Sequence, residues 1–172
     1  MPNQTASRSS HTTSLALPKG LRDRIGYLLN RPAYLFRERA QELLKPLGLI
    51  PPHFGVMATL ESEGPQTQRS LGKLLRVDPT TMVWIIDHLE KAGFVRRGRH
   101  PQDRRAHLVE LSPSGKAAYE RASKRLCQLE EDFLAPLTKR ERDDLRRLLT
   151  KLFQIVPTQT VSPKMFKKGH EE

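Results

Sequence analysis

The strongest constraint on the fold is a pair of helical patterns in residues 67–93 that are separated by only three residues. The first covers about residues 67–75, with leucines at the three- and four-residue spacing of one helix face. These are Leu71, Leu74 and Leu75. The second follows Asp78, which can cap a helix that starts at Pro79, and it ends at Gly93. Its inward face consists of Met82, Ile85, Ile86 and Leu89. Two helices joined by so short a turn predict a helix-turn-helix.

The segment that follows predicts a β-hairpin. Residues 94–97 and 106–111 flank a loop that contains glycine and proline, and the second stretch alternates apolar and polar residues as a half-buried strand does. A hairpin directly after a helix-turn-helix is a wing. From Arg96 to His107 this wing carries five arginines and Asp103, a net charge of +4. So many arginines favour contact with a polyanion over a solvated charged loop, which is the alternative for this segment.

Helical periodicity also covers the sequence before the helix-turn-helix. A long helix is predicted from Leu21 to Leu44, and Pro32 should kink it or split it in two. A second helix starts at the proline pair that begins with Pro51 and stops at Gly64. Proline is tolerated in the first turn of a helix, and glycine is frequent just after the last turn.

Two more helices are predicted after the wing. Ser112 and Pro113 start the first, and Pro136 ends it. Its apolar stripe consists of Ala118, Ala122, Leu126, Leu129 and Phe133. Thr138 and Glu141 form a capping box at the start of the last helix. Its apolar stripe consists of Leu145, Leu148, Leu149, Leu152 and Phe153.

The two ends of the chain are polar. Residues 1–18 predict a disordered arm, because they offer too little apolar surface to offset the entropy of ordering, and residues 157–172 predict a flexible tail. The predicted fold is mainly α with a small β-hairpin wing. It places one helix in residues 19–48, a winged helix-turn-helix in residues 49–111 and two helices in residues 112–156.

Composition narrows the class of function. Thirty Lys and Arg against nineteen Asp and Glu give a net charge of +11, which favours nucleic acid over an anionic membrane as the partner. The single cysteine, Cys127, excludes an intrachain disulfide and fits a reducing cytoplasm. No apolar run is long enough for a membrane span or a signal peptide. The sequence lacks a Gly-rich phosphate loop, G-x-S-x-G and H-E-x-x-H, so an enzyme is not expected.

Four segments together resemble the MarR family of winged-helix transcriptional regulators, over residues 21–156. They are PPHFGVMATL, SLGKLLRVDPTTMVWIIDHLEKAGFV, DRRAHLVELSPSG and LTKRERDDLRRLLTKL. The resemblance implies a homodimer joined by its first and last helices, with the second helix of the motif in the major groove of duplex DNA. It also implies that the Asp-x-Arg of the wing, Asp103 and Arg105, shapes the wing and enters the minor groove. Two residues depart from the family's pattern: Trp84 stands where arginine is frequent, and Ile50 stands where a hydroxyl residue usually caps the helix.

The outer face of the second helix holds the candidates for reading bases, since a major groove about 12 Å wide admits one α-helix. They are Thr80, Thr81, Val83, Trp84 and His88, with Asp87 beside them. For Trp84, burial against neighbouring elements is an equal alternative. The preceding helix begins with three residues suited to phosphate contacts. These are Gln68, Arg69 and Ser70. The wing offers arginines for the minor groove or the backbone, and an aspartate to pair with one of them. These are Arg99, Arg104, Arg105 and Asp103.

The apolar stripes outside the winged domain predict a two-fold partner, because so small a domain cannot cover them by itself. In such a dimer the two copies of the helix-turn-helix would lie about 34–36 Å apart, which predicts a pseudo-palindromic operator. A dimer bound there would block a promoter, which predicts repression. By the family resemblance, a small aromatic or phenolic ligand bound between the dimerisation helices and the winged domain would release the DNA. The candidates for that site are Tyr27, Arg31, His53 and Met57.

Several alternatives stay open. Each ligand candidate has an ordinary core or surface role as its alternative. Oxidation of Cys127 is a rival trigger, although its place beside Leu126, with no second cysteine, favours inert burial. The histidines show no metal-ligand spacing, so no metal and no cofactor is expected. A winged module that binds nucleic acid without sequence preference, or binds a protein, is the alternative to a sequence-specific regulator.

Overall fold

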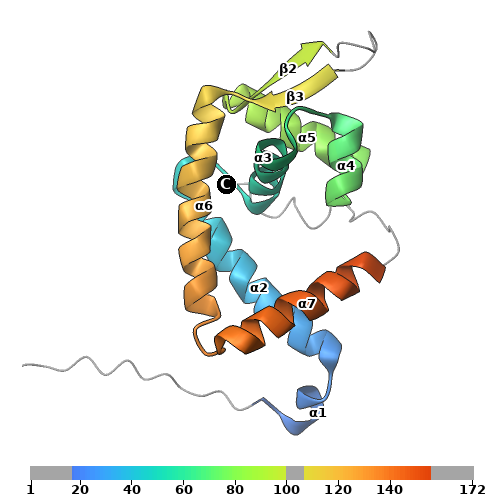
Figure 1. Ribbon diagram of the computed structural model, residues 1–172, viewed down its shortest axis with the longest axis vertical. Coiled ribbons are helices and arrows are strands. Elements are labelled where there is room, and N and C mark those ends of the chain that lie inside the picture. Colours follow the sequence, from blue (N-terminus) through green and yellow to red (C-terminus); the bar gives the residue numbers. More distant parts are fainter. Residues whose placement is uncertain (1–16, 100–106, 156–172) are drawn as a thin grey trace, which may run out of the picture. The chain divides into compact units, whose positions relative to one another are not determined.

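The computed structural model describes residues 17–99 and 107–155, which are mostly helical (Figure 1). In chain order the elements are α1 (Lys19–Arg22), α2 (Ile25–Leu44), the 3-10 helix η1 (Lys45–Leu47), α3 (Pro51–Glu63), β1 (Gln66–Thr67), α4 (Gln68–Leu75), α5 (Pro79–Lys91), β2 (Val95–Arg99), β3 (His107–Leu111), α6 (Pro113–Phe133) and α7 (Lys139–Ile155). They fall into two compact units, residues 1–35 and 36–172, which divide within α2. The predicted fold class, mainly α with a small β-hairpin wing, is confirmed.

The first unit contains α1 and the beginning of α2. Helix α2 includes Pro32 and continues through it, so the split predicted at this proline is wrong. Pro32 removes only the hydrogen bond that its amide would have donated to the carbonyl of Leu28, and the flanking turns keep theirs. The helical pattern is interrupted instead at residues 23–24, between α1 and α2.

The predicted helix-turn-helix is formed by α4 and α5, and the turn between them is residues 76–78. Thr67 caps α4, because its hydroxyl accepts a hydrogen bond from the amide of Ser70 at 3.1 Å. Arg76 ends α4 in the left-handed conformation, with φ of 53°. The amide of Val77 then donates to the carbonyl of Gly72 at 2.9 Å, which closes the turn before α5 begins.

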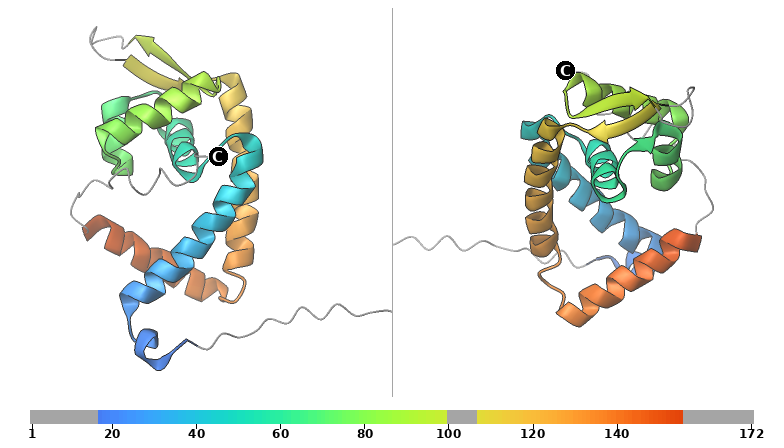
Figure 2. Two further views of the ribbon diagram at one scale, coloured as in Figure 1. Left: turned by 180° about the vertical axis from the view of Figure 1, so that it is seen from behind. Right: turned by 45° about the horizontal axis from the view of Figure 1, so that its top comes forward.

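The wing belongs to a sheet of three antiparallel strands in the order β1-β3-β2. In the hairpin, Arg97 lies opposite Val109, and Arg96 lies opposite Glu110. The hairpin lies beside α5, as the views in Figures 1 and 2 agree. Strand β1 was not predicted, since it has only two residues, of which Thr67 is also the cap of α4, and so short a segment carries no periodicity. It pairs with β3 through Gln66 and anchors the start of α4 to the sheet.

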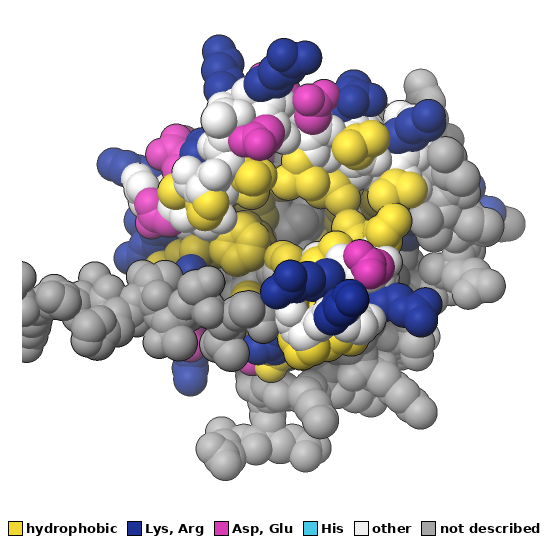
Figure 3. All heavy atoms as spheres, turned by 90° about the horizontal axis from the view of Figure 1, so that it is seen from below, with side chains coloured by type: hydrophobic (Ala, Val, Ile, Leu, Met, Phe, Trp, Pro, Cys, Tyr) yellow, Lys and Arg dark blue, Asp and Glu magenta, His cyan; other side chains and the backbone are white. Residues whose placement is uncertain are grey.

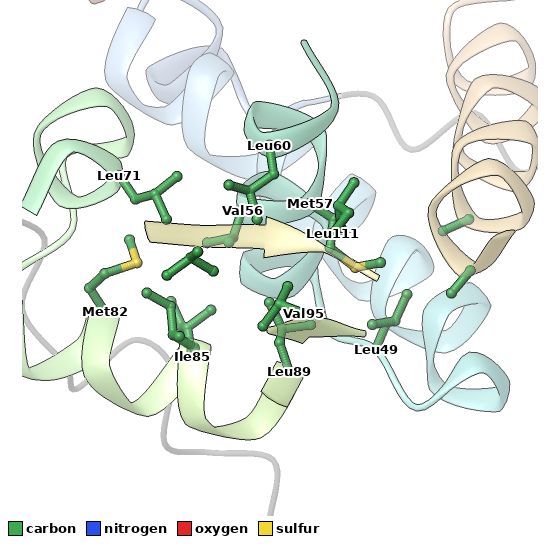
Figure 4. Close-up of a cluster of buried hydrophobic side chains, with 14 of the residues drawn as sticks. Leu49, Val56, Met57, Leu60, Leu71, Met82, Ile85, Leu89, Val95 and Leu111 are labelled. Atoms are coloured by element: carbon green, nitrogen blue, oxygen red, sulfur yellow. The ribbon is translucent and has the colours of Figure 1, made fainter. Parts of the chain in front are cut away.

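One core of apolar side chains joins α3, α4, α5, the sheet and α6 (Figure 4). Its fully buried members include Val56, Met57, Leu71, Met82, Ile85, Ile86, Leu89 and Val109. The predicted inward face of α5 is therefore confirmed. On α4 the prediction was partly wrong, because Leu74 is 51% exposed. The buried face of this short helix centres on Leu71, and Leu75 packs at its side.

The junction between the end of α5 and the start of α6 is unusually close. The hydroxyls of Ser112 and Ser114 both donate to the carbonyl of Gly93, at 2.6 and 2.7 Å. The amide of Ser112 donates to the carbonyl of Phe94 at 3.0 Å. A side-chain carbon at Gly115 would lie 1.9 Å from that same carbonyl oxygen. Only glycine therefore allows the first turn of α6 to rest on this backbone.

Helices α6 and α7 begin where the sequence predicts. The Ser112 hydroxyl accepts from the amide of Gly115 at 2.9 Å and caps α6. At α7 the capping box is present: Glu141 accepts from the amide and hydroxyl of Thr138, at 2.8 and 2.7 Å. These hydrogen bonds, the backbone one first, hold the pKa of Glu141 below its ordinary value. The end of α6 is held by an edge-to-face contact between Phe133 and Phe36, with ring centroids 5.4 Å apart.

Candidate nucleic-acid interface

The exposed face of α5 is the surface that a helix-turn-helix would present to a groove. Because Met82, Ile85, Ile86 and Leu89 are buried, the residues about half a turn away point outward. Thr80 and Asp87 are exposed, and Val83 is 41% exposed. The predicted positions of Thr80 and Val83 on the outer face are confirmed, while their role in base contact stays a prediction.

Thr81 was predicted on this outer face, and that position is wrong. Its side chain is buried, and its hydroxyl donates to one carboxylate oxygen of Asp78 at 2.6 Å. Its amide donates to the other oxygen at 3.0 Å. These two bonds, the hydroxyl one first, lower the pKa of Asp78. Thr81 therefore completes the cap of α5 and has no free surface with which to touch a base.

Trp84 is half-buried and packs against the core, which supports the burial alternative for this residue. Its ring stacks on that of His53 from α3, with centroids 5.8 Å apart and planes 29° from parallel. The ring centroid of His88 lies 4.1 Å from that of Trp84 and 6.1 Å from that of His53, so the three rings form one cluster. The ring of His88 is exposed and is held in place by a hydrogen bond from Nδ1 to the Trp84 carbonyl at 2.8 Å. The indole thus packs against two imidazoles that also lie beside each other.

The start of α4 presents one cation. Arg69 is exposed, whereas Gln68 and Ser70 are half-buried. The hydroxyl of Ser70 donates to the side-chain oxygen of Gln66 at 2.9 Å, and this bond joins α4 to β1. Of the three residues predicted to contact phosphates, Arg69 is the one whose side chain is freely placed for it.

Two of the five wing arginines are held by carboxylates of the protein itself. Arg96 donates to Glu110 directly across the hairpin, at 2.7 Å. Arg97 points to the other face of the sheet, where it donates to both Asp87 and Glu90 of α5. Neither ion pair was predicted from the sequence, since both depend on strand register and on how the hairpin packs against α5. Arg96 and Arg97 are consecutive residues of one strand, so their side chains lie on opposite faces of the sheet. This alternation is the sequence signal that could have separated their roles.

The ion pairs of Arg97 tie the wing to α5. Burial is the largest influence on the pKa of Arg97 and lowers it. The hydrogen bond to Asp87 and the charges of Glu90 and Asp87 outweigh burial, so the pKa lies above its ordinary value. Arg97 therefore stays protonated and keeps both contacts at any physiological pH.

Arg99 ends β2 and is exposed, and its contact with a groove or a phosphate stays a prediction. The other predicted wing residues, Asp103, Arg104 and Arg105, lie outside the described residues. Arg99 on the wing and Arg69 on α4 are thus exposed cations that lie on either side of α5 in sequence.

The four predicted ligand residues divide between the two units. Tyr27 is half-buried and Arg31 is exposed in the first, where the Arg31 guanidinium lies 5.7 Å from the ring centroid of Tyr34. In the second unit His53 is buried beside Trp84, and Met57 has no exposed surface. The prediction that Met57 lines a crevice is therefore wrong, because the inner face of α3 faces the core. A shallow open depression of about 410 Å³ is lined instead by Leu60, Glu61, Gly64, Pro65, Arg96, Glu110, Leu111, Pro113 and Lys116.

Cys127 is exposed on α6, so the predicted inert burial of this thiol is wrong. It lies on the outer side of a helix whose inward face is formed by Ala118 and Ala122. Within residues 17–99 and 107–155, His, Cys, Asp and Glu form no group of three that could hold a metal ion. No helix in these ranges is long and apolar enough to cross a membrane.

Comparison with known proteins agrees with this geometry. The sequence model of the MarR family matches residues 49–107. The chain is 32% identical to an HTH-type transcriptional regulator of Bacillus subtilis, YwoH, over 74% of this chain and 89% of that protein. Two solved structures are similar. One is a mutant of MarR from E. coli complexed with operator DNA, at 27% identity and a TM-score of 0.70 over 80% of this chain and 99% of that one. The other is BpsR from Bordetella bronchiseptica, whose DNA binding is regulated by 6-hydroxynicotinic acid, at 25% identity and a TM-score of 0.71 over 79% and 97%.

Proposed function

This chain belongs to the MarR family of transcriptional regulators, and from that premise we propose that it is a cytoplasmic, homodimeric repressor that binds a pseudo-palindromic operator. The observation that carries the proposal is the exposed face of α5. This helix is the second of the helix-turn-helix, and Arg97 ties it to the wing. The similar structure of MarR from E. coli contains operator DNA. Helix α5 would enter the major groove while Arg99 and the loop after it reach the neighbouring backbone or minor groove.

A second copy of the chain is proposed because α7 carries an uncovered apolar stripe. Its exposed side chains are Leu148, Leu149, Leu152 and Phe153. In the first unit, α2 likewise exposes Ile25, Leu28, Leu29, Tyr34 and Leu35. Figure 3 shows exposed hydrophobic side chains among charged ones in the view from below. An exposed apolar stripe on a helix marks a contact with another protein, and a two-fold dimer buries the same stripe on both subunits.

Such a dimer would hold two copies of α5 about one helical turn of DNA apart, roughly 34–36 Å, so each half-site would lie on the same side of the duplex. An operator of this length that overlaps a promoter would exclude RNA polymerase. Repression by occlusion is therefore the proposed mode of action, with no chemistry at the site.

A small aromatic acid is the proposed effector, because the similar protein BpsR responds to 6-hydroxynicotinic acid. An effector releases DNA only if it binds more tightly to a form of the dimer in which the spacing of the two α5 helices does not match the operator. Tyr27, Arg31 and His53 stay candidates for its site.

The test is binding of the full chain to duplex DNA from the region upstream of its own gene, followed by fluorescence anisotropy at several salt concentrations. The expected result is a specific complex that random duplex competes for poorly and that weakens steeply with salt. Equal competition by random duplex would identify a nonspecific nucleic-acid binder instead. Thermal-shift screening against aromatic acids then tests the effector, since a ligand of the folded dimer must raise its Tm.

A further inference from the structure

The base-reading face of α5 lacks the side chains that usually identify purines. Arginine pairs with guanine through two hydrogen bonds, and asparagine or glutamine does the same with adenine. The α5 sequence PTTMVWIIDHLEK contains no Arg, Asn or Gln, and its one lysine, Lys91, is the last residue of the helix. Asp87, the only acid on the outer face, is occupied by Arg97. Bidentate purine contacts from this helix are therefore not available.

What α5 does expose near its beginning is apolar. Val83 is 41% exposed, one turn after Thr80, whose exposed side chain ends in a methyl and a hydroxyl. Valine has one strongly preferred side-chain rotamer in a helix, so its two methyls are held in a fixed direction. The next residue, Trp84, is packed against His53 and His88 and against the core, so it is held in place beside Val83.

We propose that Val83, together with the methyl of Thr80, reads the C5-methyl group of thymine in the major groove. Thymine is the base that presents a methyl group there, and apolar contact is the recognised way to detect it. Cytosine and uracil leave the same position bare. The inference rests on the proposed insertion of α5 into the groove, and it makes Val83 a specificity-determining residue.

The experiment separates the methyl from the rest of the base. A duplex is first selected from a random pool by the full chain, and each half-site is then made with thymine, with deoxyuridine or with 5-bromodeoxyuridine. Removing one contacted methyl should weaken binding by about fourfold, because the complex then buries one apolar carbon fewer. Bromine has nearly the volume of a methyl group, so 5-bromodeoxyuridine should restore the affinity.

Two variants assign the effect to Val83. Val83→Ala should bring the affinities for the thymine and deoxyuridine duplexes closer together, because it removes the Val83 contact with the methyl and leaves only that of Thr80. Its partly exposed position should leave the Tm nearly unchanged. Lys91→Ala, the matched control on the same helix, should lower the affinity for both duplexes and keep their ratio. A selected duplex whose deoxyuridine form binds wild-type protein as tightly as the thymine form overturns the inference. So does a Val83→Ala protein that keeps the wild-type ratio. A chain that selects no duplex at all overturns the proposed function itself.

Discussion

Arg97 of β2 donates to the carboxylate of Asp87 in α5, so the first strand of the wing and the helix of the helix-turn-helix are joined by an ion pair. Glu90, one turn further along α5, accepts from the same guanidinium. The wing is therefore positioned by the helix that it flanks as well as by its own strand pairing.

Arg97→Gln should weaken binding to the selected operator by about 1 kcal/mol, roughly fivefold in Kd, which is typical of coupling within one ion-pair network. Its cost to folding should stay at about 1 kcal/mol or less, because the two carboxylates are partly exposed and screened. Anisotropy titration and thermal melting measure the two quantities. Arg96→Gln, which removes a pair on the opposite face of the same strand, should have the smaller effect on Kd. Equal losses in the two variants would show that the tie to α5 does not matter.

Gly115→Ala should lower the free energy of unfolding by at least about 2 kcal/mol, since the added methyl meets the Phe94 carbonyl oxygen at 1.9 Å and forces the backbone apart. Urea unfolding followed by circular dichroism gives the value. The matched control is Gly55→Ala in α3, where the new carbon lies 4.0 Å from a Leu75 methyl, an ordinary contact. There the higher helix propensity of alanine should leave stability unchanged or raise it by about 0.5–1 kcal/mol. Similar stability of the two variants would contradict the close junction.

Asp78→Asn should make stability less dependent on pH in the acid range. The folded-state pKa of Asp78 lies below its ordinary value of 3.8, so its carboxylate stabilises the fold above that value. This contribution is lost as the pH falls through the lowered pKa. Asparagine keeps a capping oxygen but does not titrate. Melting curves from pH 7 to pH 2 should therefore show wild type more stable at neutral pH and the difference disappearing in acid. A constant difference across this range would rule out the charge of Asp78 as its source.

Leu152→Asp should dissociate the proposed dimer, because it places a charge in the apolar stripe of α7. Losing one buried leucine costs about 1.5–3 kcal/mol, so the dimer dissociation constant should rise at least roughly tenfold. Analytical ultracentrifugation measures it, and operator affinity should fall in parallel. Gln154→Glu adds a charge on the opposite side of the same exposed helix and should leave the dimer intact. If both variants sediment like wild type, the stripe is not the dimer contact.

Local features of this fold could be predicted from the sequence because their partners lie within one helical turn. The capping box of Thr138 and Glu141, the Asp78 cap and the three-residue turn each depend on neighbours three or four residues away. The errors at Thr81 and Leu74 come from helical spacing alone. Helical spacing gives the direction of each side chain around the helix axis. It does not show which edge of the buried face is covered by a neighbouring element.

The features that escaped prediction depend on partners distant in the chain. Strand β1 exists only because β3, more than forty residues later, offers its free edge to Gln66. The role of Arg97 required the packing of the hairpin against α5, and periodicity carries no information on that contact. For the candidate interface, charge counting pointed to the wing, and its contact with DNA stays a prediction. Charge counting overstated the number of arginines available to DNA, because Arg96 and Arg97 already have carboxylate partners.

The shared carbonyls of Gly93 and Phe94 have a mechanical consequence. The last residues of α5, the first of the wing and the opening turn of α6 are hydrogen-bonded at one point, with no slack in the chain between them. We therefore expect a tilt of α6 to move the end of α5 and the hairpin together with it.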